Sequence, residues 1–389
     1  MLIRDEILVT ESSTTTVRLV EIGALGPRVS LAELGAPGGP NISYAVAENL
    51  QPLSLTAPIF LNREEFADVF PAGDVVRHGA LACSVRNCFM FSPFGLIVLP
   101  DGTIIRQSVL QTDSSSMSFT IAQFQGQFPG GHVMWAAATE SLLSFNCYST
   151  NNYFHFVMDA LAQTHWRARL PAMNGARMIV SGYTAEAASV LPFVGESLAA
   201  VGIGEADLYP FDGTMMFCRH VVFPTRDTGA NPAKVAALRH MLGLKGRPRG
   251  RSRIFISRAQ AARRRILNEA AVAALLAKHG FRAVDPGTLS FREQVEIFAD
   301  AEIVVGPHGA GLTNAAFMAP GGAVVELTHT GRVVWTFHEV ACASKLAYAC
   351  VVGDMAAGEG PALFADFTVD VDAVDSAVRA AVAAVGQGP

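Results

Sequence analysis

The chain has 389 residues, of which 50% are hydrophobic and 16% are charged, a balance that excludes a disordered or fibrous protein and indicates about two globular domains. Its 29 basic and 34 acidic residues give a net charge of −5, which excludes general binding to nucleic acid. The first 125 residues alternate short hydrophobic runs with turn residues, and Pro100-Asp101-Gly102 predicts a hairpin turn. We therefore expect residues 1–125 to be rich in β-strands.

From residue 151 the pattern changes to alternating helices and strands. Asn152 can cap a helix whose hydrophobic residues recur at the spacing of one helix face. Strands are predicted at 177–181 and 215–224, with a helix over 185–201 between them. This alternation predicts a partly parallel sheet over residues 126–229.

The alternation is most regular in residues 230–371. The predicted strands are 253–257, 281–284, 302–305 and 323–327. Between them, Asn268 is expected to cap one helix, and Ser290 and Glu293 form a capping box at the start of another. This order predicts a doubly wound nucleotide-binding domain. The last segment, 372–389, is expected to form a helix that packs back on the N-terminal domain, residues 1–229.

Membrane insertion, secretion and a metal site are not expected. The N-terminus lacks the apolar stretch of a signal peptide, and polar residues interrupt the longest charge-free segment. The six cysteines show no metal-ligand spacing, and Asp370-Val-Asp372 is expected to cap the last helix rather than to bind a metal. We therefore expect no metal and no cofactor, and a cytoplasmic location that includes the inner membrane face as an option.

Residues 306–314, Gly-Pro-His-Gly-Ala-Gly-Leu-Thr-Asn, form a Gly-rich loop between a predicted strand and a predicted helix. Backbone N–H groups at such a place attract an anionic phosphate, although a tight turn without a ligand is the alternative. Five loop residues are proposed to contact the ligand: His308, Gly309, Ala310, Gly311 and Asn314.

An NAD(P)-dependent oxidoreductase is a second interpretation of this loop. Gly309-Ala-Gly311 matches part of G-x-G-x-x-G, and Glu326 ends the next strand, where an acid that binds ribose would stand. However, Asn314 occupies the position of the third glycine, and no Tyr-x-x-x-Lys pattern follows. The oxidoreductase therefore stays the alternative.

Two further groups of residues suit catalysis on an anionic substrate. His155 and Asp159 are four residues apart on a predicted helix, so they share a face and form either a proton relay or a merely structural pair. Eleven of the 29 basic residues lie within 228–268, which contains no Asp or Glu. Those near the loop are expected to reach a diphosphate, whereas those around 247–251 are expected to be linker charges. The former are Arg258, Arg263, Arg264 and Arg265.

Four parts of the sequence, taken together, resemble family 61 glycosyltransferases of the bacterial capsular-polysaccharide type. They are Asn152-Tyr-Phe-His155 with Asp159, Ile256-Ser-Arg258 with Arg263-Arg264-Arg265, the segment 290–299 and the segment 305–314. The resemblance implies a GT-B-like α/β fold, in which two Rossmann-like domains face a cleft. It also implies inverting transfer of a sugar from a nucleotide donor, with UDP-sugar expected, to a glycan or lipid-linked glycan in polysaccharide biosynthesis.

The resemblance also implies roles for the residues named above. Arg258, Arg263 and Arg264 would bind the donor diphosphate, the Gly-rich loop would cradle it, and Glu326 would reach the nucleoside. Asp159, or His155 oriented by it, would be the general base on the acceptor side. A non-catalytic sugar-nucleotide-binding protein is a further alternative.

Overall fold

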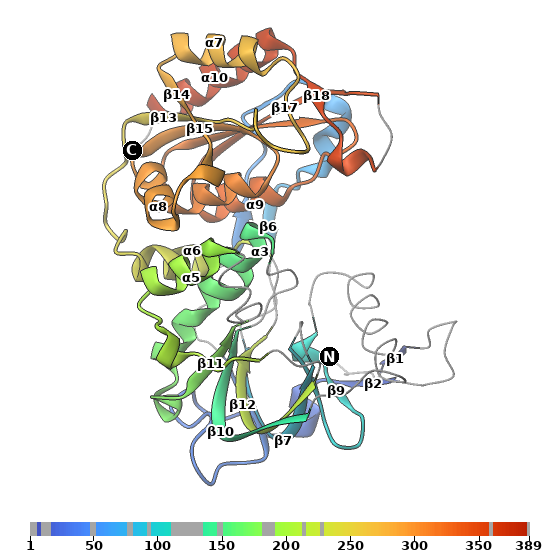
Figure 1. Cartoon of the computed structure of the whole chain (residues 1–389). Helices are drawn as coiled ribbons and strands as arrows, with labels where there is room; N and C mark the ends of the chain where they lie inside the picture. The colour runs from blue at the N-terminus through green and yellow to red at the C-terminus, as the bar shows by residue number, and fades with distance from the viewer. Residues whose placement is uncertain are drawn as a thin grey trace. The chain divides into compact units, whose positions relative to one another are not determined.

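The computed structural model divides the chain into two compact units (Figure 1). The first comprises residues 1–50 and 78–228, and the second comprises 51–77 and 229–389. Within these, the structure describes residues 6–8, 17–46, 52–75, 81–91, 95–109, 135–145, 151–180, 191–211, 215–225, 229–357 and 361–386. In that described part, every helix is too short or too polar to span a bilayer.

The first unit contains a mixed sheet with the order β1-β2-β9-β8-β7-β12-β10-β11, and β3 pairs with β7. The strands are β1 (Glu6–Leu8), β2 (Val17–Val20), β3 (Ile42–Val46), β7 (Leu81–Phe91), β8 (Leu96–Val98), β9 (Ile104–Ile105), β10 (Trp135–Phe145), β11 (Arg177–Val180) and β12 (Met215–Pro224). The predicted hairpin is confirmed, since β8 and β9 are antiparallel and Thr103 N donates to Asp101 Oδ1 over 2.9 Å. Parallel pairing among the described strands joins β2 to β9 and β10 to β11 and β12, so this half is only partly Rossmann-like.

The helix predicted after Asn152 begins as expected but changes its winding. Asn152 Oδ1 accepts from Phe154 N over 3.0 Å, and one helical turn, α3 (Tyr153–His155), follows. The chain continues as a π-helix, η3 (Phe156–Ala160), and a 3₁₀-helix, η4 (Leu161–Arg169). The remaining helical segments of this unit are α1 (Ile22–Leu25), η2 (Arg106–Ser108), η5 (Pro171–Met173), α5 (Pro192–Ala200) and η6 (Glu205–Asp207). Helix α5 confirms the second half of the helix predicted over 185–201, whereas residues 181–190 lie outside the described residues.

The second unit is built on a parallel sheet with the order β14-β13-β15-β16-β17. Its strands are β13 (Ser252–Ile256), β14 (Phe281–Val284), β15 (Ala301–Pro307), β16 (Ala323–His329), β17 (Ala347–Met355) and an antiparallel β18 (Phe367–Thr368). All four strands predicted in this region are confirmed. The strand order reverses between β13 and β15, and ligands of open α/β sheets bind at the carboxyl ends of strands at such a point.

Residues 51–77 complete this second unit, although we had assigned them to the N-terminal domain. Their elements are β4 (Leu53–Leu55), β5 (Phe60–Leu61), η1 (Glu64–Val69) and β6 (Gly73–Val75). Strand β5 pairs parallel with β17, and the Asn62 side chain exchanges two hydrogen bonds with the Val352 backbone, of 3.1 and 2.8 Å. The segment therefore extends the sheet at its β17 edge.

Helices cover both faces of this sheet, with α7 (Glu269–Lys278) and α10 (Val371–Gly386) on one side and α8 (Phe291–Ala299) and α9 (Thr336–Ala343) on the other (Figure 1). The unit also contains α6 (Pro232–Met241), η7 (Pro286–Thr288), η8 (Ala310–Phe317) and η9 (Ala362–Phe364). Both hydrogen bonds of the predicted capping box join Ser290 and Glu293. Asn268 precedes α7 as predicted, but its side chain bonds the backbone of Val369 instead of capping the helix.

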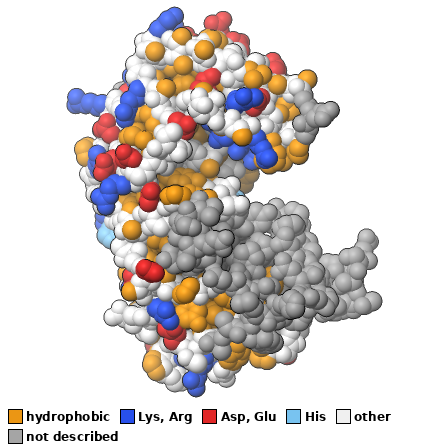
Figure 2. Space-filling view, in the orientation of Figure 1, with side chains coloured by type: hydrophobic (Ala, Val, Ile, Leu, Met, Phe, Trp, Pro, Cys, Tyr) orange, Lys and Arg blue, Asp and Glu red, His pale blue; other side chains and the backbone are white. Residues whose placement is uncertain are grey.

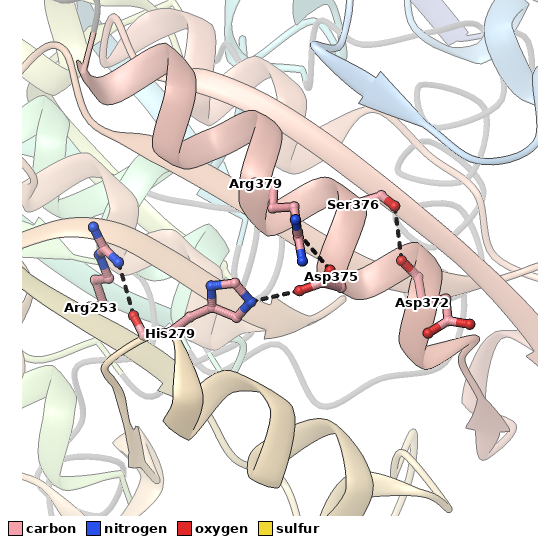
Figure 3. Close-up of polar contacts among 6 residues, drawn as sticks. All are labelled: Arg253, His279, Asp372, Asp375, Ser376 and Arg379. Atoms are coloured by element: carbon pink, nitrogen blue, oxygen red, sulfur yellow. Dashed lines mark hydrogen bonds and ion pairs between the residues drawn. The ribbon is translucent and has the colours of Figure 1, made fainter.

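Helix α10 packs on the sheet of its own unit, which corrects our expectation that it packs on the N-terminal domain. Val374 and Val378 are fully buried in a core shared with β16 and β17. At the surface, Asp375 Oδ1 meets His279 Nε2 at 2.6 Å, and Arg379 Nε donates to Asp375 Oδ2 over 2.7 Å (Figure 3). Asp372 N donates to Asp370 Oδ1 over 2.9 Å, so Asp370-Val-Asp372 begins the helix as predicted.

We predict that Val378→Ala lowers the free energy of unfolding by about 2 kcal/mol, because it removes two methyl groups from a fully buried site. Urea denaturation measures this change. Ser376→Ala on the exposed face of the same helix is the control and should change stability by less than about 0.5 kcal/mol. Equal urea midpoints for Val378→Ala and the wild type would contradict the packing of α10 described above.

Candidate functional site

The Gly-rich loop follows β15 at the carboxyl edge of the second sheet. Gly306 lets the sheet pack, because a Cβ there would lie 2.9 Å from Ile256 Cβ. A Cβ on Gly309 would lie 3.1 Å from Arg258 Nη1 and 3.7 Å from Arg264 Nη1. The loop backbone therefore approaches two of the arginines that we expected to bind a diphosphate.

His308 is buried in this loop and is held by a carboxylate. Its Nδ1 is hydrogen-bonded to Glu326, whose second oxygen accepts from the Tyr348 hydroxyl over 2.6 Å. Burial is the main cause that raises the pKa of Tyr348, so its hydroxyl keeps the proton that it donates. Glu326 is 1% exposed and uses both oxygens inside the protein. The contact of Glu326 with the nucleoside stays a prediction. Its buried position does not favour that contact.

Three guanidinium groups gather at the same edge, and we call Arg258, Arg264 and Arg332 the arginine cluster. Arg264 Nη1 donates to the His308 carbonyl over 3.1 Å. Burial, followed by the charges of Arg258, Arg332 and Arg263, lowers the pKa of Arg264 to about 10. Burial is also the main cause that lowers the pKa of Arg258 and of Arg332. All three side chains nevertheless stay positively charged at neutral pH.

The cluster arginines present buried donors that are suited to an anion. The Nε atoms of all three are buried and lack a hydrogen-bond partner among the residues that the structure describes. A buried donor without an acceptor costs roughly 1–3 kcal/mol, and more when it is charged. The arrangement therefore fits a ligand with several negatively charged oxygens, which guanidinium groups bind in a forked geometry.

The backbone around Arg264 is held in an uncommon conformation. Its φ angle of 57° lies in the left-handed region, which non-glycine residues seldom adopt. Arg264 N donates to the Phe364 carbonyl over 3.3 Å, and the next residue, Arg265, forms an ion pair with Asp366 at 2.6 Å. These contacts hold the turn that carries Arg264, and such strain concentrates at functional sites.

His329, at the end of β16, is a further donor that the sequence analysis missed, together with Arg332. Gly331 N donates to His329 Nδ1 over 3.2 Å, which places the proton of the neutral ring on Nε2. That Nε2 is buried and lacks a partner within the described part of the chain. Burial, then the charges of His308, Arg332 and Arg264, lower the pKa of His329 and keep it neutral. The rule that parallel strands end at one edge would have found both residues.

The other predicted site residues make contacts of a different kind. The Arg263 guanidinium lies 4.5 Å from the centroid of the Phe364 ring. Asn314 is fully buried, and its Nδ2 donates to Gln294 Oε1 over 2.9 Å, so it ties the loop to α8. Arg249, expected to be a linker charge, donates to the carbonyls of Gly321 and Val385 over 3.0 Å each.

The second predicted pair lies in the first unit, on the irregular helix after Asn152. His155 Nδ1 and Asp159 Oδ2 are 2.8 Å apart. The Asp159 side chain is 2% exposed and that of His155 is 24% exposed. The imidazole is thus the member of the pair with the larger solvent-exposed surface, and the carboxylate fixes its orientation. Asp159 lies within the π-helical turn, a rare winding that is frequent at functional sites.

Residues 153–325 match the family model described as Glycosyltransferase 61. Over this stretch, which is a little under half of the chain, the sequence is similar to glycosyltransferase family 61. The matched glycosyltransferase region contains His155, Asp159, Arg258, Arg264 and His308, whereas Glu326, His329 and Arg332 follow directly after it. A search of curated proteins gave no match. This match supports a glycosyltransferase, an enzyme that has a sugar donor and an acceptor as its partners.

We predict that Arg264→Met weakens the binding of inorganic pyrophosphate by about tenfold or more, because a hydrogen bond to a charged group contributes roughly 1.5–3 kcal/mol. Isothermal titration calorimetry measures the dissociation constant. Arg379→Met is the matched control, since Arg379 is 73% exposed on α10. Equal affinities of Arg264→Met and Arg379→Met for pyrophosphate would refute the anion site.

Proposed function

We propose that this glycosyltransferase takes a sugar from a nucleoside diphosphate donor, with UDP-sugar expected, and transfers it with inversion to a hydroxyl of a glycan or lipid-linked glycan. The observation that carries the proposal is the arginine cluster with its buried, unpaired donors. A donor diphosphate offers the several charged oxygens that these nitrogens suit. Polysaccharide biosynthesis in the cytoplasm, with peripheral contact to the inner membrane face as an option, is the proposed setting.

In this mechanism the arginine cluster stabilises the leaving group. Negative charge develops on the diphosphate as its bond to the sugar breaks, and donors that are already oriented stabilise that charge without reorganising. Arg258, Arg264 and Arg332 supply the positive charge, so the proposal requires no metal ion. His329 Nε2–H and the backbone N–H groups of Ala310 and Gly311 add neutral donors at the same edge.

We assign the acceptor proton to the pair in the first unit. Inverting transfer needs a base that deprotonates the attacking hydroxyl. Because Asp159 is buried while His155 is partly exposed, we propose His155 as the base and Asp159 as the group that holds its ring through Nδ1. With this assignment, the GT-B arrangement of two domains around one donor and one acceptor is part of the proposal.

The oxidoreductase alternative loses its two supports in the second unit. The acid expected to bind ribose, Glu326, is buried between His308 and Tyr348. The position of the third glycine holds Asn314, which is fully buried and bonded to Gln294. Neither side chain is placed to accept a dinucleotide, so the nucleotide-sugar donor is the function that the geometry favours.

The experiment begins with a thermal-shift screen of nucleotide sugars, since a ligand that binds only the folded state raises the melting temperature. With the best donor, we predict that His155→Gln and Asp159→Asn each lower kcat by about 100-fold or more, the usual contribution of a general base, while the thermal shift stays unchanged. His165→Gln on the same helical segment is the control and should keep wild-type turnover. Turnover within twofold of wild type in both variants would remove the assigned base.

The same screen separates the non-catalytic alternative. A donor that raises the melting temperature of the wild type without transfer to water or to any of a panel of glycan acceptors would identify a sugar-nucleotide-binding protein. If the proposed function is correct, slow release of the nucleoside diphosphate is expected even without an acceptor, because water can attack the bound donor. A coupled assay for the released nucleoside diphosphate measures this reaction.

A further inference from the structure

A cavity of about 780 Å³ lies in the second unit beside the turn that carries Arg264. Its volume is in the range of small-molecule sites, roughly 300–1,000 Å³. The walls come from the turn before α7, the end of β17 and the segment around η9, and they include Arg263, Leu267, Met355, Phe364 and Asp366. Neither the Gly-rich loop nor the arginine cluster contributes to these walls.

Large hydrophobic side chains of this cavity are exposed to solvent. Leu267 is 55% exposed, Met355 41% and Phe364 37%. Together with Ile59 and Leu363, they are the large hydrophobic residues that are exposed in the described part of the chain. On the face drawn in Figure 2, a group of Lys and Arg side chains of the second unit lies beside hydrophobic ones. Exposed hydrophobic groups that cluster in one hollow are typical of a ligand site.

The cavity adjoins the proposed diphosphate site. A Cβ on Gly331 would lie 2.7 Å from Met355 Sδ, 3.1 Å from Ala362 Cβ and 3.3 Å from His329 Nδ1. Gly331 therefore stands between the cavity wall and one donor of the anion site. On the other side, Arg264 N donates to the carbonyl of Phe364. The cavity and the arginine cluster are therefore neighbours within the second unit.

The lining decides which part of a donor fits. A hexose carries hydroxyl groups around its ring, and those that lie against Leu267, Met355 and Phe364 would lack hydrogen bonds, which costs free energy. A nucleobase has two flat apolar faces and polar edges. The cavity matches it, since Leu267, Met355 and Phe364 offer apolar contacts and Arg263 and Asp366 bring charge to the rim.

We propose that the nucleoside of the donor lies in this cavity, with its base against Leu267, Met355 and Phe364, while its diphosphate lies at the arginine cluster. This inference rests on the proposed function and adds to it a place for the nucleoside. It gives the nucleoside a site formed by residues of the segments 262–267, 355–357 and 361–366, which differs from the position first expected at Glu326. A prenyl diphosphate, which also joins a diphosphate to an apolar group, is the competing ligand.

The test compares a nucleoside diphosphate with pyrophosphate, which has no nucleoside. Calorimetry first identifies which of UDP, CDP, ADP and GDP binds the wild type best. Phe364→Ala and Leu267→Ala should then each weaken the binding of that nucleotide about tenfold, as expected for the loss of stacking and apolar contact with one base, and leave pyrophosphate binding within twofold. Leu363→Ala is the matched control, because Leu363 is 38% exposed next to Phe364 but is not part of the wall.

The outcomes separate this inference from the proposed function. Pyrophosphate binding that depends on Arg264, with nucleotide binding unchanged in Phe364→Ala and Leu267→Ala, would overturn the nucleoside site and leave the proposed function standing. Geranylgeranyl diphosphate that binds more tightly than every nucleotide, and loses affinity in Phe364→Ala, would replace the nucleoside by a lipid. If neither pyrophosphate nor any nucleotide binds the wild type, both proposals fail. Leu267 is the more exposed of the two wall residues, so Leu267→Ala tests the site even if Phe364→Ala does not fold.

Discussion

The anion site that we propose in the second unit depends on holding three guanidinium groups together without a carboxylate that neutralises all of them. Burial imposes a cost of desolvation, and the neighbouring guanidinium charges repel one another, which together lower the pKa of Arg264 to about 10. The backbone holds the three arginines in place in spite of this cost. Arg258 and Arg332 follow parallel strands that end at one edge, and the turn that carries Arg264 is tied to the segment at Phe364. An anion bound there would relieve the repulsion, so the strain favours the liganded state.

Two acidic groups near the arginine cluster, Glu326 and Asp366, are already occupied by other partners. Glu326 adjoins the arginine cluster, but its oxygens are hydrogen-bonded to His308 and Tyr348. Asp366, which lies at the cavity wall, is paired with the exposed Arg265. The charge of Glu326 still attracts Arg332, but the two oxygens of Glu326 are already occupied by donors from His308 and Tyr348. The positive potential therefore stays concentrated where the backbone of the Gly-rich loop also presents its N–H groups.

Much of the second unit could be predicted from local patterns, because its signals act over a few residues. The capping box of Ser290 and Glu293 and the strands from β13 to β16 follow from spacing and residue type alone. The predictions that the structure corrects depend on distant partners. Asn268 looks like a helix cap, but Val369 competes for its amide, and Glu326 looks available until the hydroxyl of Tyr348, a strand away, reaches it. No sequence motif marks His329 and Arg332 as donors of the proposed anion site. They lie there because β16 ends at the same edge of the sheet as its parallel neighbours.

The pairing of residues 51–77 with the second sheet also depends on residues that are distant in the sequence, and it affects the proposed site. Strand β5 covers the edge of β17, the strand that carries Tyr348. From the same segment, the Phe70 ring packs 5.7 Å from the Tyr348 ring, between centroids, and His338 Nε2 is 2.6 Å from the Thr56 carbonyl. Tyr348 orients Glu326, and Glu326 orients His308. The proposed donor site thus depends on residues 51–77, which precede Arg258 by more than 170 residues in the sequence, through strand pairing, ring packing and a hydrogen bond. Without this segment, residues 229–389 would expose the edge of β17 and the ring of Tyr348, so we expect the second unit to need residues 51–77 for its stability.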